Sequence, residues 1–155
     1  MGSSGRPRIE KWFPNLRSAA YDITSPDSPA YNCVAWAAGD DSAWWEPTDP
    51  PQPGYHWPAG VPKTPTVDAV IEVFRARGYE TCPDSGPEAG YEKIAVYTAD
   101  DEFTHVARLL PTGRWASKLG AFEDIEHDTL DGLAGDEYGT PTHFLRRPIT
   151  PNPSP

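Results

Sequence analysis

Apolar residues recur at helical spacing in two segments of the chain. The clearer segment has apolar residues at 67, 70, 71 and 74, with Thr64 as the expected cap, Pro65 in the first turn and Gly78 at the end. The shorter segment runs from Cys33 to Ala38 and is closed by Gly39, a residue that favours the left-handed geometry of a helix C-terminus. Asp27, Ser28 and Asn32 are the alternative caps of this second helix.

Alternating apolar and polar residues predict strands in the second half of the chain. These strands are expected at 93–99, 103–110, 114–119 and 139–147, and residues 123–134 are expected to form a short helix or a turn. Helices come first and an antiparallel meander follows. The order predicts an α+β fold in which N-terminal helices pack on a small antiparallel sheet.

Length and composition indicate one globular domain with ordered loops. The chain has 155 residues, which predicts a single domain over residues 12–147 with loose ends at 1–11 and 148–155. Nineteen prolines and six tryptophans indicate that much of the chain forms ordered loops, which the proline rings restrict and the packed tryptophans stabilise. Residues 40–65 are too long for an ordinary connection, and their Trp44, Trp45 and Trp57 either fill space or line a cleft for a peptide or sugar.

Charge and cysteine content exclude several classes of partner. The net charge is −10 and basic residues do not cluster, so we expect no nucleic-acid partner. No apolar run approaches the roughly 18 residues of a membrane span, so we expect no membrane association. Two cysteines make no disulfide framework, and a cytoplasmic, reduced protein is favoured over a bridge between Cys33 and Cys82. The oligomeric state stays open.

One cysteine and one histidine carry the strongest candidate chemistry. Cys33 follows Asn32 in the first turn of its helix, where free N–H groups and the helix dipole are expected to lower a thiol pKa. His105 lies 72 residues later, among small and apolar neighbours on its strand, where an imidazole needs a partner. The alternative is structural, because a free cysteine is commonly a small buried residue and a strand histidine is commonly satisfied by its surroundings.

The residue that orients the histidine depends on the register of the following hairpin. A three-residue loop at 111–113 places Ser117 on the same side as His105, whereas a two-residue loop places Lys118 there. Glu126 and Asp124, in the segment after the strand, are further alternatives. Ser117 is the preferred third member, followed by Glu126.

Metal and cofactor signatures are weak in this sequence. The Glu126-His127-Asp128 run lacks the spacing of a zinc site, and the chain has no phosphate loop or dinucleotide fingerprint. We therefore expect no metal and no cofactor.

The two motifs resemble those of a known superfamily. Asn32-Cys33-Val34-Ala35-Trp36 resembles the cysteine helix of the small bacterial CHAP and NlpC-like amidases of the papain-like superfamily, and Thr104-His105-Val106-Ala107 resembles their histidine strand. The resemblance implies a papain-like fold with Cys33 as nucleophile, His105 as base and an orienting group on the next strand, where residues 114–118 lack the usual acidic or amide residue. The chain also looks similar to uncharacterised bacterial proteins with Tyr-Asn-Cys and Ser-Lys-Leu-Gly signatures.

These observations lead to one functional hypothesis and one alternative. We expect a cysteine-dependent amide or ester hydrolase or acyl-transfer enzyme, acting on a peptide or another amide-containing substrate. Asn32, Trp44, Trp45 and Trp57 are the expected substrate-binding residues. The alternative is a non-catalytic binding module that grips its partner with the tryptophan-rich loop.

Overall fold

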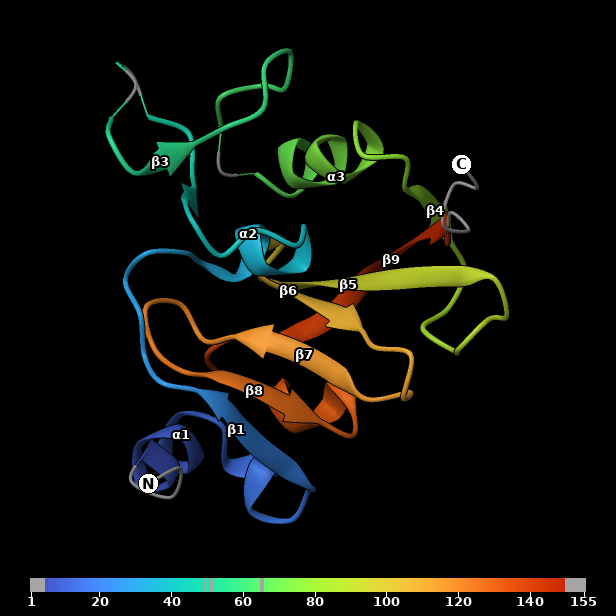
Figure 1. Cartoon of the computed structure of the whole chain (residues 1–155). Helices are drawn as coiled ribbons and strands as arrows, with labels where there is room; N and C mark the ends of the chain where they lie inside the picture. The colour runs from blue at the N-terminus through green and yellow to red at the C-terminus, as the bar shows by residue number, and fades with distance from the viewer. Residues whose placement is uncertain (1–4, 49, 51, 65, 150–155) are drawn as a thin grey trace, which may run out of the picture.

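A seven-stranded antiparallel sheet forms the centre of the protein (Figure 1). The computed structural model describes residues 5–48, 50, 52–64 and 66–149. From one edge to the other, the strands are β1 (Tyr21–Ser25), β8 (Asp124–His127), β7 (Trp115–Lys118), β6 (Glu102–Leu109), β5 (Tyr91–Ala99), β9 (Thr140–Pro148) and β4 (Glu80–Cys82).

Short helices cover the two faces of this sheet. They are α1 (Arg6–Trp12), the 3-10 helix η2 (Pro14–Arg17), α2 (Cys33–Ala37), α3 (Val67–Arg75) and the 3-10 helix η3 (Leu130–Leu133). Residues of α2 and α3 build one apolar core with alternate strand residues such as Val96 and Val106. Residues of α1, η2 and η3 build a second core with the intervening positions, such as Tyr97 and Ala107. The sheet therefore has two buried faces, with α2 and α3 on the first (Figure 1).

The long loop carries a small structure of its own. A two-stranded parallel ribbon, β2 (Trp44–Trp45) with β3 (Tyr55–His56), lies on the side of α2 (Figure 1). No helix in the described residues is both long enough and apolar enough to cross a membrane.

The expected α+β, papain-like arrangement of helices on a small sheet is wrong. The described protein is mostly β: the sheet has seven strands and the α-helices are short. One difference is the edge strand β4, which pairs with β9 and was not predicted. Another arises at residues 123–134, where the sequence predicts a helix or turn and the structure has β8 followed by η3. Strand β8 then pairs with β1, a further strand that the sequence analysis did not predict.

Most of the other expected elements are present, with shifted ends. Strands β5, β6, β7 and β9 confirm the four predicted strands, and α2 and α3 confirm the two predicted helices. The side chain of Thr66, not Thr64, caps α3 by accepting a hydrogen bond from the amide of Ala69. Pro65 lies outside the described residues.

The N-terminal end is less loose than expected. Residues 6–11 belong to α1, and Ile9 is fully buried in the second core. A proline at the start of this helix, Pro7, fits the first turn because that position needs no amide donor. At the C-terminal end, Pro148 still belongs to β9, and the amide of Ile149 donates to the carbonyl of Gly90 at 2.8 Å. Residues 1–4 and 150–155 of the two expected tails lie outside the described residues.

Candidate functional site

Asn32 fixes the position of the candidate nucleophile. Its side-chain oxygen accepts hydrogen bonds from the amides of Ala35 and Trp45, both at 3.1 Å, and its nitrogen donates to the carbonyl of Trp45 at 2.9 Å. One buried amide side chain thus caps α2 and joins it to β2. Cys33 is the first residue of this capped helix. Of the three alternative caps, the structure selects Asn32.

The Cys33 thiol is buried and neutral at rest. Its residue is 9% exposed, and burial raises the pKa of the thiol to about 11. Backbone hydrogen bonds from Val106 and Val34 and the charge of Lys118 lower this pKa, but they are outweighed. The expected thiolate at the helix end is therefore wrong for the resting protein, because desolvation is the larger effect.

The hairpin register brings Ser117 to His105. Arg108 pairs with Ala116 and Leu109 with Trp115, which is the register of the three-residue loop. Ser117 and His105 then lie on the same face, and the Ser117 hydroxyl is 2.9 Å from Nε2 of His105. Both residues are fully buried.

A chain of hydrogen bonds continues from Ser117 to a second histidine. The Ser117 hydroxyl is 2.8 Å from Nε2 of His127, and Nδ1 of His127 is 2.8 Å from the carbonyl oxygen of Thr129. His127 belongs to β8, the strand that the sequence analysis did not predict.

This chain of hydrogen bonds determines which ring nitrogens carry protons. The Thr129 carbonyl can only accept, so Nδ1 of His127 donates to it. Burial lowers the pKa of His127 to about 4, so its ring is neutral and Nε2 accepts from the Ser117 hydroxyl. The Ser117 oxygen then accepts from Nε2–H of His105. Burial keeps the pKa of His105 well below its ordinary value, and a proton on His127 would lower it further, so the His105 ring is neutral with a lone pair on Nδ1.

Nδ1 of His105 is buried and has no hydrogen-bond partner among the described residues. Aromatic rings hold the imidazole in place: Tyr138 stacks on it with centroids 4.2 Å apart, and Tyr97 meets it edge-on at 5.4 Å. An unpartnered buried nitrogen costs free energy and is a common mark of a functional group.

Local backbone features place these rings. Strand β6 has an irregularity at Thr104: Tyr97 pairs with His105 and Thr98 with Phe103, so Thr104 is left between the pairs. The Thr104 hydroxyl donates to the carbonyl of Tyr138 at 2.6 Å and so ties the bulge to the stacked ring. Bulges of this kind redirect side chains next to functional sites.

Gly139 lets the loop that carries Tyr138 lie against β5. Its φ is +71°, and a Cβ at this position would stand 2.0 Å from the carbonyl oxygen of Thr98. Any other residue would meet backbone there, so the loop could not approach as closely. The stacking of Tyr138 on the imidazole depends on this approach.

Cys33 and His105 approach from opposite faces of the sheet. Cys33 belongs to the first core, whereas His105 packs on Tyr97 and Tyr138 at the second. No hydrogen bond joins the sulfur to the imidazole within the described residues. Helix α2 nevertheless packs on β6, and the backbone of Val106, the residue after His105, lowers the pKa of the thiol.

The strands separate at this place. The ladder between β6 and β7 consists of the pairs Arg108–Ala116 and Leu109–Trp115. Val106 and Lys118, the next residues on the face of α2, stand outside it, and both influence the thiol. The groups that influence the thiol therefore lie just beyond the end of the ladder between β6 and β7.

Lys118 is a buried cation beside the thiol. Its Nζ donates to the carbonyls of Ser28 at 2.7 Å and Gly120 at 2.6 Å, and it lies 4.6 Å from the ring centroid of Tyr31. Burial lowers the pKa of Lys118, while Asp124 and Cys33 oppose this effect.

The structure does not bring the two candidate carboxylates to His105. Glu126 precedes His127 on β8, so the two side chains lie on opposite faces of the sheet. The carboxylate of Glu126 pairs with Arg114, whose Nη1 is 3.5 Å from Oε1. Asp124 lies on the face of α2, where the Tyr31 hydroxyl donates to it at 2.7 Å and Ser25 also bonds to it. Of the proposed orienting residues, Ser117 alone bonds to the imidazole among the described residues.

A cavity of about 210 Å³ opens beside Cys33. Its walls include three of the four expected substrate-binding residues, Asn32, Trp45 and Trp57, together with Phe103 and Thr104. Trp44 is absent from the described lining and instead donates its Nε1–H to Glu46 at 3.1 Å. The tryptophan-rich loop thus forms a wall of the cavity that reaches the thiol.

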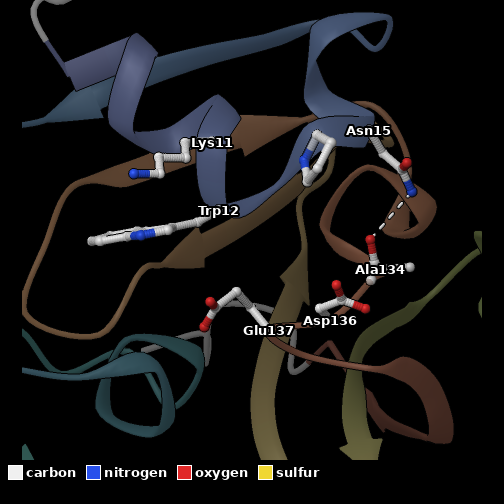
Figure 2. A pocket seen from close by; sticks show the side chains of 8 residues that line it. Lys11, Trp12, Asn15, Ala134, Asp136 and Glu137 are labelled. Carbon is white, nitrogen blue, oxygen red and sulfur yellow. Dashed lines mark hydrogen bonds between the residues drawn. The ribbon is translucent and has the colours of Figure 1, made fainter.

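A larger cavity lies elsewhere on the molecule. It has a volume of about 450 Å³ and lies between α1 and the loop after η3, with Trp12, Asn15 and Glu137 in its lining (Figure 2). Asn15 spans one side by donating to the carbonyl of Ala134 at 3.2 Å (Figure 2). None of the described residues that line it is a cysteine or a histidine. The smaller cavity is therefore the better candidate for chemistry.

His127 and Tyr138 contribute to the site, but the sequence analysis assigned them no part in it, and it considered Lys118 only as the neighbour of His105 under a two-residue loop. His127 was considered only as part of a metal motif, and within the described residues no group of three or more potential ligands is placed to hold a metal ion. The alternation of β8, with Ile125 and His127 on one face, is the signal that could have placed His127 beside Ser117.

Comparison with known proteins yields one match. The model of a family described as "Domain of unknown function (DUF7689)" matches residues 22–146. No curated protein and no solved structure matches the chain.

Proposed function

The chain belongs to the DUF7689 family, whose description states no activity, and we propose from the geometry of its site that it is a cysteine-dependent hydrolase or acyl-transfer enzyme. The observation that supports the proposal most is the unpartnered Nδ1 of His105. Its lone pair is set by the hydrogen bonds through Ser117 and His127, and a general base needs such a lone pair.

In the proposed mechanism, the thiol and the imidazole are both neutral before reaction. His105 takes the proton of Cys33 at Nδ1 as the sulfur attacks a carbonyl carbon. The new imidazolium then gives this proton to the leaving amine or alkoxide, and an acyl group remains on the sulfur. Water or an amine removes the acyl group in a second step with the same base. This order fits the raised pKa of the thiol, because it needs no thiolate at rest.

The residues around the pair support charge as it develops. Ser117 accepts the Nε2–H of His105, so the ring can carry a positive charge without losing its hydrogen bond. The amides of Val106 and Val34 and the ammonium of Lys118 favour negative charge on the sulfur. The likeness of the Cys33 and His105 motifs to those of CHAP amidases is consistent with this chemistry.

Alkylation of the two cysteines tests the role of His105. We would measure the rate at which iodoacetamide labels Cys33 by peptide mass spectrometry, with the half-exposed Cys82 of the same chain as the internal reference. General-base assistance contributes about 10²–10⁴-fold in enzymes. We expect His105→Gln to slow the labelling of Cys33 at least about 10-fold and to leave Cys82 unchanged. Equal rates for Cys33 in folded wild type and variant would refute the proposal.

An ester substrate tests acyl transfer directly. With p-nitrophenyl acetate, the acetyl group would pass to the Cys33 sulfur and p-nitrophenolate would leave. We expect one acetyl group on the peptide that contains Cys33, and none after Cys33→Ser. Acetylation that persists in that variant would show that another residue reacts.

The alternative is the binding module with the tryptophan-rich loop. The observation that favours it is the neutral, buried thiol without a bond to His105. It requires that the reactivity of Cys33 does not depend on His105 and that no acyl group accumulates.

A further inference from the structure

The cavity beside Cys33 has walls that suit one class of substrate group. Trp45, Trp57, Phe103 and Val70 contribute apolar surface, and Cys33 itself is part of the lining. A group held in this cavity would be attached close to the carbonyl that the sulfur attacks.

The polar atoms of these walls are already engaged inside the protein. The Asn32 side chain bonds to the backbone of Trp45, and the Thr104 hydroxyl donates to the carbonyl of Tyr138. The Trp45 indole donates to Asp40 at 2.7 Å, and the Trp57 indole donates to Pro62 at 2.9 Å. A polar substrate group would lose its water here and gain little in return.

The size of the cavity limits the group that fits. Its volume is about 210 Å³, which is room for roughly seven waters at about 30 Å³ each. A phenylalanine side chain has about seven heavy atoms and a leucine side chain about four, so the cavity has room for either. Of the described residues in the lining, Glu46 carries a charge; it is exposed and receives the indole hydrogen bond of Trp44.

We propose that this cavity binds an apolar side chain of leucine to phenylalanine size on the acyl side of the substrate, and that Glu46 discriminates against acidic groups. The proposal rests on the proposed function, since it assigns the substrate group to the same thiol. The net charge of −10 acts in the same direction as Glu46, because it disfavours anionic substrates.

Chloromethyl ketones of N-acetylated amino acids test the proposal. The Cys33 sulfur displaces chloride to form a thioether, and the thiol proton passes to His105. We would compare the second-order rates of the phenylalanine, leucine, glycine and aspartate reagents by mass spectrometry. We expect phenylalanine and leucine to react at least about 10-fold faster than glycine, and aspartate to be the slowest. Equal rates for all four reagents would overturn the proposal.

Two matched pairs of variants assign the effect to the cavity. Trp57→Ala should remove most of the preference for apolar reagents, whereas Trp44→Ala, which changes a tryptophan outside the lining, should keep it. Glu46→Lys should speed the aspartate reagent relative to glycine. Asp136→Lys makes the same charge change at the larger cavity and should not. Equal effects within either pair would contradict the assignment.

Iodoacetamide separates this proposal from the function on which it rests. The reagent has no side chain for the cavity, so it reports the reactivity of Cys33 alone. Labelling that depends on His105 without selectivity among the chloromethyl ketones would leave the enzyme proposal standing and refute the cavity proposal. Labelling independent of His105 would refute the function itself.

Discussion

Removal of the Ser117 hydroxyl should lower the free energy of unfolding by several kcal/mol, although only one oxygen atom is lost. Ser117→Ala deletes one oxygen, but that oxygen bridges two fully buried imidazoles. Nε2 of His105 and Nε2 of His127 would each lose a partner. A buried polar group left without a partner costs about 1–3 kcal/mol, so we expect a loss of about 2–6 kcal/mol in the free energy of unfolding.

Urea unfolding measures this loss, and thermal unfolding should show the same change. A domain of this size loses about 2–4 °C in Tm per kcal/mol, so even the lower bound predicts a fall of at least about 4 °C. Ser18→Ala, at an exposed serine, is the matched control and should change stability by less than about 0.5 kcal/mol. Ser117→Thr keeps a hydroxyl and should retain more stability than Ser117→Ala.

A spectroscopic measurement on the wild type tests the assignment of protons to the two histidine rings. Nitrogen-15 NMR of the histidine rings should show the proton of His105 on Nε2 in the wild type. If Ser117→Ala lowered the free energy of unfolding as little as Ser18→Ala does, or if His105 carried its proton on Nδ1, the reasoning about the hydrogen-bond chain would be refuted. Because that chain supplies the lone pair, either result would also weaken the enzyme proposal.

Three other perturbations have definite expected outcomes. His127 takes up a proton near pH 6.5 in the unfolded chain, whereas burial holds its pKa at about 4 in the folded protein. The free energy of unfolding, measured with urea, should therefore fall by about 3 kcal/mol from pH 7 to pH 4, and by less in His127→Gln. Gly139→Ala should lower Tm more than Gly113→Ala, because both have positive φ but only the first meets backbone, 2.0 Å away. Asn32→Ala should cost at least about 2 kcal/mol in urea unfolding, against about 1 for the simpler cap Thr66→Ala.

The sequence by itself determined most of the local elements and reduced the choice of neighbours for His105. The spacing of apolar residues is enough for α3 and for the four strands that it predicted, because period and packing face are properties of a short segment. Hairpin register follows from loop length, so the sequence reduced the neighbour of His105 on the next strand to Ser117 or Lys118, and the structure has the three-residue loop that selects Ser117.

The tertiary structure alone decided the extent of the sheet and the electrostatics of the site. Strand β8 has one apolar residue in four, so its alternation was too weak a signal to predict its pairing with β7 and β1, and the place of His127 was missed with it. Burial, a property of the whole fold, raises the pKa of Cys33 where the helix end alone would lower it. The point at which the ladder between β6 and β7 ends also depends on how the two strands pack in the sheet, and no spacing in the sequence encodes it.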